Sequence, residues 1–340
     1  MGLNEKFFKS AAGGVVATDN FNTVIYDGTG VSNLVTGVGF AADFIWFKGR
    51  DYADNHFFID SVRGINKILL SNSTAAEATT TGGSIDSIND DGYTLQSTPP
   101  YYGINFPAKD QVAWNWKAGG AAVSNTDGTV TSQVSANVDA GFSIVSFSNN
   151  NNFSNTFGHG LDAQPELVFI KGVNFTVDWF TYVHSLGKDK RLKLNSSDAV
   201  SNWSSNDGTN TATGINDTTL SFAYSGTTYN FIAYCFHSVD GYQKIGIYSG
   251  NAASGSGTTQ AIVTGFLPSW IMVKNITSGS SDWVITDSTR GLTKELYPDL
   301  PNIENTDSNG IQSFNSNGFT VGNGFNFNRS SNDYIYLAIA

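Results

Sequence analysis

Two short stretches of the chain carry residue types that could do chemistry: an aspartate, an arginine three positions later, and then a glycine. Phe57–Gly64 reads FFIDSVRG and Val284–Gly291 reads VITDSTRG. A carboxylate used twice could belong to an active site such as that of a carbohydrate depolymerase, where carboxylates flank the bond that breaks. The same residues also suit a tight turn. Aspartate accepts main-chain N–H bonds, arginine can reach back to it, and glycine tolerates positive φ.

A third stretch decides between these two interpretations. DWFTYVHSLG occupies the corresponding place in the middle of the chain and ends in His184, Ser185, Leu186 and Gly187, with the aspartate replaced and the arginine absent. A fold can lose one such bond, whereas a required catalytic pair could not be lost from that copy. We therefore predict a structural turn and no catalytic residues. The turn residues are Asp60, Arg63, Gly64, Asp287, Arg290 and Gly291.

The turn belongs to a longer order of segments that occurs three times. An alternating strand comes first, then an apolar strand that ends in Lys48, Lys171 or Lys274, then the aromatic strand that enters the turn. The first and last copies continue into INDDGYTL and FNSNGFTV, where Asp-Gly and Asn-Gly fit tight hairpin turns. Each copy closes on an apolar strand. Such repetition indicates that the turn does the same structural job in each copy.

The segments around the turn predict an all-β chain. Their length, alternation and β-branched or aromatic content favour strands. We expect three tandem antiparallel β-sandwich-like repeats of about 100 residues, jelly-roll or lectin-like, because two sheets packed face to face cover both surfaces of such strands. Short helices are expected near Ala75–Ala78 and near Thr293–Leu296.

The expected domain bounds follow the repeats. The last two copies join almost directly at Asp240-Gly241, so we expect them to touch. The segment between the first two copies is small and polar, and we interpret it as a linker that contains a hairpin or an edge strand. The bounds are 1–20 for a separate N-terminal segment, 21–119 for the first repeat, 120–140 for the linker, 141–240 for the second repeat and 241–340 for the third.

Composition excludes several classes of partner. The net charge is −11 and lysine and arginine form no cluster. Nucleic-acid binding needs such a cluster and an acidic lipid surface would repel this chain, so we expect no nucleic acid and no membrane insertion. No apolar stretch is long enough to span a membrane. The single cysteine, Cys235, stands in FIAYCFHS, which predicts a buried, unreactive thiol.

Motifs for other chemistry are missing from the sequence. The four histidines lack the spacing of metal ligands, and neither a phosphate-binding loop nor a nucleophile elbow occurs. Asp54 and Asp60 stand close in DNHFFID, but a glycosidase pair must be held at a set distance across a cleft. We predict no cofactor and no metal, with a single calcium site as an open alternative.

The aromatic residues divide into two groups. Trp46, Trp114 and Trp270 lie in apolar strands and are predicted to be core. Tyr101 and Tyr102 follow two prolines, and Trp203 stands in the polar run SNWSSNDG. We consider these three rings candidates for binding a receptor or partner, because flat rings on stiff loops suit sugars and protein surfaces. The alternative is that they fold back onto their own domain.

The ordered motifs resemble a repeat of virion proteins from marine tailed bacteriophages, those that infect cyanobacteria (cyanophages) and abundant ocean bacteria (pelagiphages). The motifs are GF-x-P-x-W-I-x-V-K, D-S-x-R-G, N-G-F-T and VAWNWKAGG, together with the linker VSNTDGTVTSQVSANVDAGFSIVS. The resemblance covers essentially the whole chain, although the middle copy lacks the aspartate and arginine of the turn. It implies no catalytic residues.

The first residues, MGLNEKFFKSAAGG, are similar to short heads on other proteins of such phages. A shared head with variable bodies suggests a virion-docking segment, in which Leu3, Phe7 and Phe8 bury against a partner with Lys6 and Lys9 beside them. The alternative is a frayed terminus.

The resemblance leads to one expected function with two rivals. We expect a non-enzymatic virion structural protein, a tail fibre or tail-tip protein that displays β domains for adhesion to the host surface. The rivals are a capsid decoration or cement protein on the major capsid lattice and, more distantly, a depolymerase. Expected partners are other tail or capsid proteins and a host cell-surface glycan. The chain would form a homotrimer or a pseudo-threefold monomer, assembled into the virion in the host bacterial cytoplasm.

Overall fold

The computed structural model describes residues 14–80, 84–96, 103–150, 155–203, 215–222, 224, 227–253 and 257–340. In this part of the chain the fold is all-β, built from several antiparallel sheets. Helical turns in these ranges are limited to two 3-10 helices, η1 (Ala17–Asp19) and η2 (His184–Leu186). The sheets fall into three sets along the chain, which we call the first unit (residues 21–116), the second unit (123–236) and the third unit (243–339).

The first unit has a main sheet of order β1-β9-β3-β4-β5-β6 and a smaller outer sheet of order β2-β8-β7. The strands are β1 (Phe21–Asp27), β2 (Asn33–Thr36), β3 (Phe44–Gly49), β4 (His56–Asp60), β5 (Lys67–Leu70), β6 (Ala78–Thr79), β7 (Ile85–Asn89), β8 (Gly92–Leu95) and β9 (Asp110–Trp116).

The second unit has a main sheet of order β10-β11-β12-β19-β14-β15-β16-β17 and an outer pair, β13-β18. The strands are β10 (Val123–Asn125), β11 (Ser132–Asn137), β12 (Phe142–Asn150), β13 (Thr156–Gly158), β14 (Leu167–Gly172), β15 (Phe180–Val183), β16 (Lys190–Lys193), β17 (Ser201–Asn202), β18 (Thr219–Ser221) and β19 (Thr227–Phe236).

The third unit has a main sheet of order β20-β28-β22-β23, an outer sheet of order β21-β27-β26, and the pair β24-β25 joined to β23 through the Ile285–Leu296 bridge. The strands are β20 (Gln243–Ser249), β21 (Gln260–Val263), β22 (Trp270–Asn275), β23 (Trp283–Asp287), β24 (Lys294–Glu295), β25 (Asn305–Thr306), β26 (Ile311–Asn315), β27 (Gly318–Val321) and β28 (Asp333–Ile339).

The three main sheets share one strand order and one register. In each, the last strand of the unit lies between two earlier strands of its main sheet: β9 between β1 and β3, β19 between β12 and β14, and β28 between β20 and β22. The same register defines equivalent residues in the three units. The pairs Trp46–Trp114, Phe169–Tyr234 and Met272–Leu337 are equivalent, and so are Phe44–Asp60, Leu167–Val183 and Trp270–Asp287.

Each main sheet is covered on both faces, which explains its apolar central strands. In β3, Ile45 and Phe47 face the outer sheet of the first unit, while Phe44 and Trp46 belong to a central cluster that all three units share. Every residue of β3, β14 and β22 is buried. The sequence of a strand that is buried on both faces is a continuous apolar run and does not alternate between apolar and polar residues.

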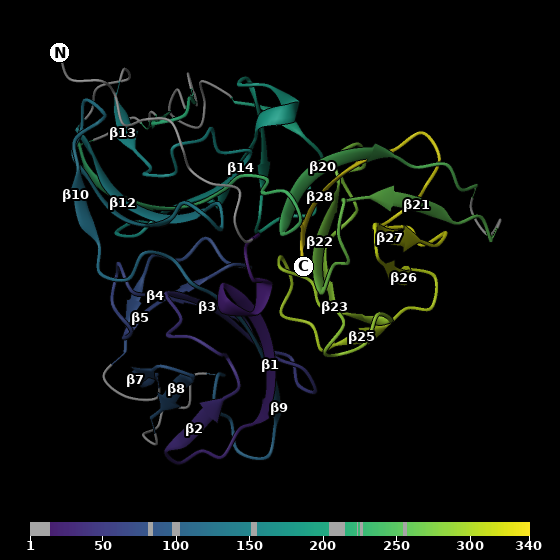
Figure 1. Cartoon of the computed structure of the whole chain (residues 1–340), viewed down its shortest axis with the longest axis horizontal. Coiled ribbons are helices and arrows are strands. Elements are labelled where there is room, and N and C mark those ends of the chain that lie inside the picture. Colours follow the sequence, from purple (N-terminus) through teal and green to yellow (C-terminus); the bar gives the residue numbers. More distant parts are fainter. Residues whose placement is uncertain are drawn as a thin grey trace.

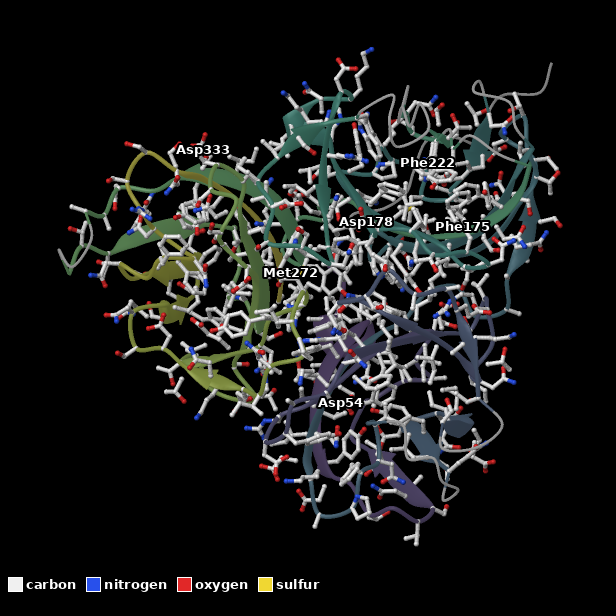
Figure 2. The ribbon with its side chains drawn as sticks, turned by 180° about the vertical axis from the view of Figure 1, so that it is seen from behind. Asp54, Phe175, Asp178, Phe222, Met272 and Asp333 are labelled. Carbon is white, nitrogen blue, oxygen red and sulfur yellow. The ribbon has the colours of Figure 1, made fainter. Side chains whose placement is uncertain are left out.

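The central cluster holds the units together, and Figure 1 shows the three units as lobes that meet in the middle of the molecule. Side chains fill this meeting region in Figure 2, where Met272 of β22 is labelled. The prediction that Trp46, Trp114 and Trp270 are core is confirmed. The aromatic members of the cluster are Phe21, Phe44, Trp46, Phe58, Trp114, Trp116, Phe142, Phe169, Trp179, Tyr234, Phe236, Tyr242, Trp270 and Trp283.

The expected linker is part of the second unit. Residues 123–125 and 132–137 form a hairpin whose second strand, β11, pairs with β12 from Gln133–Ser146 to Asn137–Phe142. The prediction of a hairpin or edge strand was therefore correct in kind, but the segment does not stand between two domains. It adds two strands to an edge that β1 and β20 leave open in the other main sheets.

Both short helices expected from the sequence are wrong. Ala78–Thr79 is β6, which pairs with Lys67 and Ile68, and Lys294–Glu295 is β24. In the second case the main-chain N–H of Leu296 bonds to Ile285 across the sheet at 3.1 Å. These segments are too short for helical propensity to outweigh pairing with a neighbouring strand. Cys235 is buried as predicted, and burial raises the pKa of its thiol to about 12.

Candidate functional site at the seams between the units

The turn at Asp60 has the bonds of a self-contained motif. The main-chain N–H of Arg63 donates to Oδ1 of Asp60 at 2.8 Å, and the Arg63 guanidinium donates to Oδ2 of Asp60 and to the carbonyl of Phe58. Gly64 follows with a φ of +107°. The Asp60 side chain is fully buried, so no substrate can reach this carboxylate.

The turn at Asp287 repeats this geometry. Arg290 donates from its main-chain N–H to Oδ1 of Asp287 at 2.8 Å and from Nε to Oδ2 at 2.6 Å, and Gly291 has a φ of +103°. The side chains of Asp287 and Arg290 are both fully buried. In the second unit Gly187 keeps a positive φ of +87°, while Val183 and Leu186 take the places of the aspartate and the arginine.

Each of the two carboxylates also receives a donor from another unit. The hydroxyl of Tyr234, in the second unit, donates to Oδ2 of Asp60 in the first at 2.7 Å. The indole Nε1 of Trp114, in the first unit, donates to Oδ2 of Asp287 in the third at 3.0 Å. Tyr234 and Trp114 are equivalent residues on the last strands of their units. The turn is thus a connector across a seam, the boundary between two units.

The seam between the second and third units is apolar at the equivalent positions. Leu337 of the third unit stands where Tyr234 and Trp114 stand, and Val183 of the second stands where the aspartates stand. Both are buried in the central cluster, and Leu186 packs against it. The donor, the carboxylate and the arginine have therefore been replaced together, which leaves no buried charge without a partner.

A second set of seam bonds uses indole groups. Nε1 of Trp179 donates to the carbonyl of Leu70 at 2.8 Å, and Nε1 of Trp283 donates to the carbonyl of Lys193 at 2.9 Å. His56 occupies the equivalent place in the first unit. Its ring faces the main chain of Tyr297, and burial lowers its pKa well below the usual value. The first–third seam therefore carries a neutral imidazole where the other two carry an indole.

The three lysines noted at the strand ends lie at the seams too. Nζ of Lys171 donates to the carbonyl of Thr74 in the first unit at 2.9 Å, and Nζ of Lys274 donates to that of Ser197 in the second at 3.0 Å. Lys48 bonds to the carbonyl of Gly49 within its own unit. All three side chains are buried, and burial lowers each pKa to about 8.

One main-chain hydrogen bond recurs at all three seams. The N–H of Glu77 donates to Val173, that of Val200 to Ile276 and that of Glu304 to Arg50, at 2.8, 3.0 and 2.7 Å. At the first–third seam the side chains add a bidentate ion pair, with Nε of Arg50 donating to Oε2 of Glu304 at 2.9 Å. The three units thus form a closed ring, in which each unit contacts both others.

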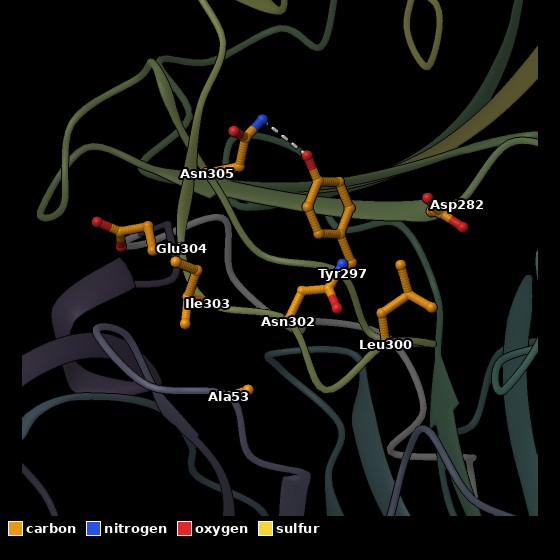
Figure 3. A pocket seen from close by; sticks show the side chains of 8 residues that line it. All are labelled: Ala53, Asp282, Tyr297, Leu300, Asn302, Ile303, Glu304 and Asn305. Carbon is orange, nitrogen blue, oxygen red and sulfur yellow. Dashed lines mark hydrogen bonds between the residues drawn. The ribbon is translucent and has the colours of Figure 1, made fainter.

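A pocket of about 590 Å³ opens beside the first–third seam. Its lining residues are Ala53, Asp282, Tyr297, Leu300, Asn302, Ile303, Glu304 and Asn305 (Figure 3). The hydroxyl of Tyr297 donates to Oε2 of the buried Glu295 at 2.8 Å and accepts from Nδ2 of Asn305 at 3.0 Å. Burial raises the pKa of Glu295 to about 7. The pocket combines one ring with amide and carboxyl groups, a lining able to hold a small polar ligand.

The candidate binding residues are only partly within the described ranges. Tyr101, Tyr102, Leu3, Lys6, Phe7 and Phe8 lie outside them. Trp203 is half-buried and folds back onto its own unit, with its ring 5.6 Å from that of Phe180 and 5.4 Å from the guanidinium of Arg191. The ring thus packs on the outer core of the second unit. No group of three or more metal-ligating side chains occurs among the described residues.

The sequence missed the residues that join the units. It singled out the turn but not Tyr234, Trp114 or the Arg50–Glu304 pair, since no local pattern shows which unit a side chain faces. One signal was present: a lysine ends each apolar strand, and an apolar strand has no local reason to end in a charge. A buried lysine needs carbonyl acceptors, and for Lys171 and Lys274 some of these come from another unit.

Comparison with known proteins gives a family and little else. No helix in the described ranges is long and apolar enough to cross a membrane. No curated protein and no solved structure matches the chain significantly. Residues 16–340 match a single family, so one family domain spans all three units. The chain therefore belongs to the family described as Domain of unknown function (DUF7483).

Proposed function

We propose that the three units are copies of one β-sandwich-like domain with jelly-roll or lectin-like character, arranged around a pseudo-threefold axis. The shared strand order, the equivalent registers and the seam bond that occurs three times support this proposal. Each unit also sets a main sheet against a smaller outer sheet over its own core. A single chain then supplies what a homotrimer would otherwise supply.

This chain, we further propose, is a non-enzymatic structural protein of a bacteriophage virion, in a tail fibre or at the tail tip. The observation that carries the proposal is the closed ring, joined to the sequence resemblance over the whole chain. Contacts that bury charge and aromatic surface are made between units, so the ring is a stiff body that displays its outer sheets and loops. Many copies on one particle would turn weak contacts with a host surface glycan into firm attachment.

The buried turns support a role without catalysis. Asp60 and Asp287 each accept bonds from an arginine and from a neighbouring unit, and both side chains are fully buried. A depolymerase would need these carboxylates open to a cleft. If the turn were catalytic, Asp60→Ala and Asp287→Ala would abolish glycan cleavage in a stable protein. We expect both variants to lose stability instead.

Docking to the particle is assigned to the N-terminal segment. The family domain begins at residue 16, so residues 1–15 stand outside it. We propose that Leu3, Phe7 and Phe8 bury against another virion protein, with Lys6 beside them. A chain that lacks residues 1–13 should fold normally and fail to join the particle.

A capsid decoration protein is the second candidate. A pseudo-threefold ring within one chain would let a single copy sit on a local threefold axis of a capsid lattice, where a homotrimer needs three copies. This placement predicts binding to tail-less heads, whereas a fibre predicts binding to host cells.

Immunogold labelling of purified virions separates the two placements. An antibody against this chain should label the tail or its fibres if the lead proposal is correct. Gold spread over the head would establish the decoration role, and an unlabelled particle would refute both. Light scattering of the purified chain adds the oligomeric state: a monomer fits the intrachain ring, and a stable trimer would require a further interface.

A further inference from the structure

A side chain that follows the turn accepts the same main-chain hydrogen bond in all three units, but the residue is not the same in each. Oδ1 of Asn72 accepts from the main-chain N–H of His56 at 3.1 Å. Oδ1 of Asn195 accepts from that of Trp179 at 2.8 Å, and Oδ1 of Asp299 accepts from that of Trp283 at 3.1 Å. The third unit therefore has an aspartate where the other two have an asparagine.

The second polar atom of this residue shows what the change means. Nδ2 of Asn72 donates to Oδ1 of Asn55 at 2.8 Å, and Nδ2 of Asn195 donates to Oδ1 of Asp178 at 2.9 Å. In the third unit the corresponding atoms are Oδ2 of Asp299 and the carboxylate of Asp282, two oxygens that can bond only through a proton. Oδ2 of Asp299 is buried and has no hydrogen-bond partner in the described chain.

We propose that Asp299 holds a proton at neutral pH and donates it to Asp282, so that this pair is a pH-dependent lock on the first–third seam. The O–H of the carboxylic acid donates the hydrogen bond here that the asparagine N–H donates in the other two units. The shared proton also removes the repulsion that two adjacent carboxylates would otherwise have. This assignment rests on equivalent positions in one chain and is independent of what the protein binds.

The charges of Asp282 and of Lys274 in β22 act on Asp299, and Lys274 also interacts with Asp198 of the second unit. Across the first–third seam, Asp54 bonds to Pro301 of the same loop and the neutral His56 faces the main chain of Tyr297. Burial, followed by the charge of Asp282, raises the pKa of Asp299 from 3.8 to about 8, while Lys274 opposes the rise. Burial raises the pKa of Asp54 as well.

The lock affects the first–third seam because the loop that carries Asp299 makes hydrogen bonds across this seam. Its Pro298 carbonyl accepts from the buried hydroxyl of Ser71 at 2.7 Å, and its Pro301 carbonyl accepts from the N–H of Asp54 at 2.9 Å. Glu304 at the end of the loop binds Arg50. Two carboxylates facing each other without the proton would push this loop away from the strand that it covers. The ring then loosens at one seam only.

Asp299→Asn tests the lock, since an amide keeps both bonds and cannot titrate. Folded parent protein holds one more proton than the unfolded chain between pH of about 4 and about 8, so its stability falls as pH rises through this window. The unfolding constant of the parent relative to Asp299→Asn should rise by up to about tenfold per pH unit across it. If this ratio of unfolding constants does not change with pH, the proposal is refuted. The reciprocal change, Asn195→Asp opposite Asp178, should create a new loss of stability of the same sign.

Hydrogen exchange locates the effect. Protection of the Asp54 and Glu304 amides, corrected for the intrinsic rate, should fall above pH of about 8 in the parent and not in Asp299→Asn. The amide of Glu77, which makes the equivalent bond at the first–second seam, is the internal control and should stay unchanged. Loss of protection at both seams in both proteins would refute a local lock.

Infrared difference spectra give a direct readout that needs only one variant. At pH 7 the parent should show the carbonyl band of a protonated carboxylic acid that Asp299→Asn lacks. If Asp299→Asn does not fold, Asp282→Asn replaces it, because an amide there also removes the shared proton. Absence of this carbonyl band from the parent would refute the proposal.

Discussion

The hydroxyl of Tyr234 lies 2.7 Å from Oδ2 of Asp60, a residue 174 positions earlier in the chain, and so joins the second unit to the first. The same oxygen accepts from the Arg63 guanidinium, which also reaches Tyr234 at 3.3 Å. These donors replace the hydrogen bonds to water that the buried carboxylate loses. The bond therefore stabilises the turn and the seam at once.

Tyr234→Phe should destabilise the protein by about 1.5–3 kcal/mol, because it removes a hydrogen bond to a buried charge. The measurement is urea-induced unfolding at pH 7. Tyr93→Phe is the matched control, since the Tyr93 hydroxyl is equally buried and has no hydrogen-bond partner in the described chain. A loss no larger in Tyr234→Phe than in Tyr93→Phe would contradict a role for the seam bond.

Trp114→Phe should lose more stability than Trp116→Phe. Both changes remove the same volume from the central cluster, but Nε1 of Trp114 bonds to Asp287 while Nε1 of Trp116 has no partner in the described chain. The difference should be about 1.5–3 kcal/mol, the contribution of a hydrogen bond to a charged acceptor. Thermal and urea unfolding of the two variants side by side measure it. Equal losses would mean that Trp114 acts through its size alone.

Val183→Asp should cost about 3–5 kcal/mol, because it places a charge without a partner in the apolar seam. Adding Leu186→Arg should restore part of this loss, since the pair would recreate the turn of the other units. Adding Leu337→Tyr should restore more by supplying the missing donor. A double-mutant cycle on unfolding free energies measures the coupling. No recovery in the double variant would mean that the second unit does not place these residues as the others do.

Glu295→Gln should become more stable than the parent as the pH rises from about 4.5 to about 7. The pKa of Glu295 is raised in the folded protein, so the parent loses stability through this interval, by at most about 1.4 kcal/mol per pH unit. Glutamine keeps an acceptor for the Tyr297 hydroxyl. Unfolding midpoints across the pH range measure the effect, with Asp86→Asn at an exposed position as the control. Parallel curves for Glu295→Gln and the parent would contradict the assignment.

The order of segments in the sequence was enough to predict the all-β class and the geometry of the turn, because both are local. Alternation marks strands such as β1, and the D-S-x-R-G pattern contains its own acceptors and donors. The core positions of Trp46, Trp114 and Trp270 follow from the apolar strands around them.

The ring could not be predicted in the same way. Lys274 gives no sign in its own strand that its acceptor, the carbonyl of Ser197, lies in another unit. Trp203 was considered for binding because its neighbours are polar, yet its ring packs on Phe180, an apolar residue in a different segment. The segment Thr293–Leu296 was expected to be helical, and its pairing across the sheet depends on β23 being in place. In each case the deciding contact is distant in sequence.

The position of each unit's last strand also governs how the protein can be made. In the described ranges β28 pairs with both β20 and β22 and separates them, so the third main sheet stays incomplete until residues 333–339 have left the ribosome. Until then the aromatic surface that the first two units present to the third stays in contact with water. Every nascent chain therefore passes through a stage in which the third unit is incomplete and a large apolar surface is exposed. The yield of folded protein should therefore depend on chaperones that cover this surface during synthesis.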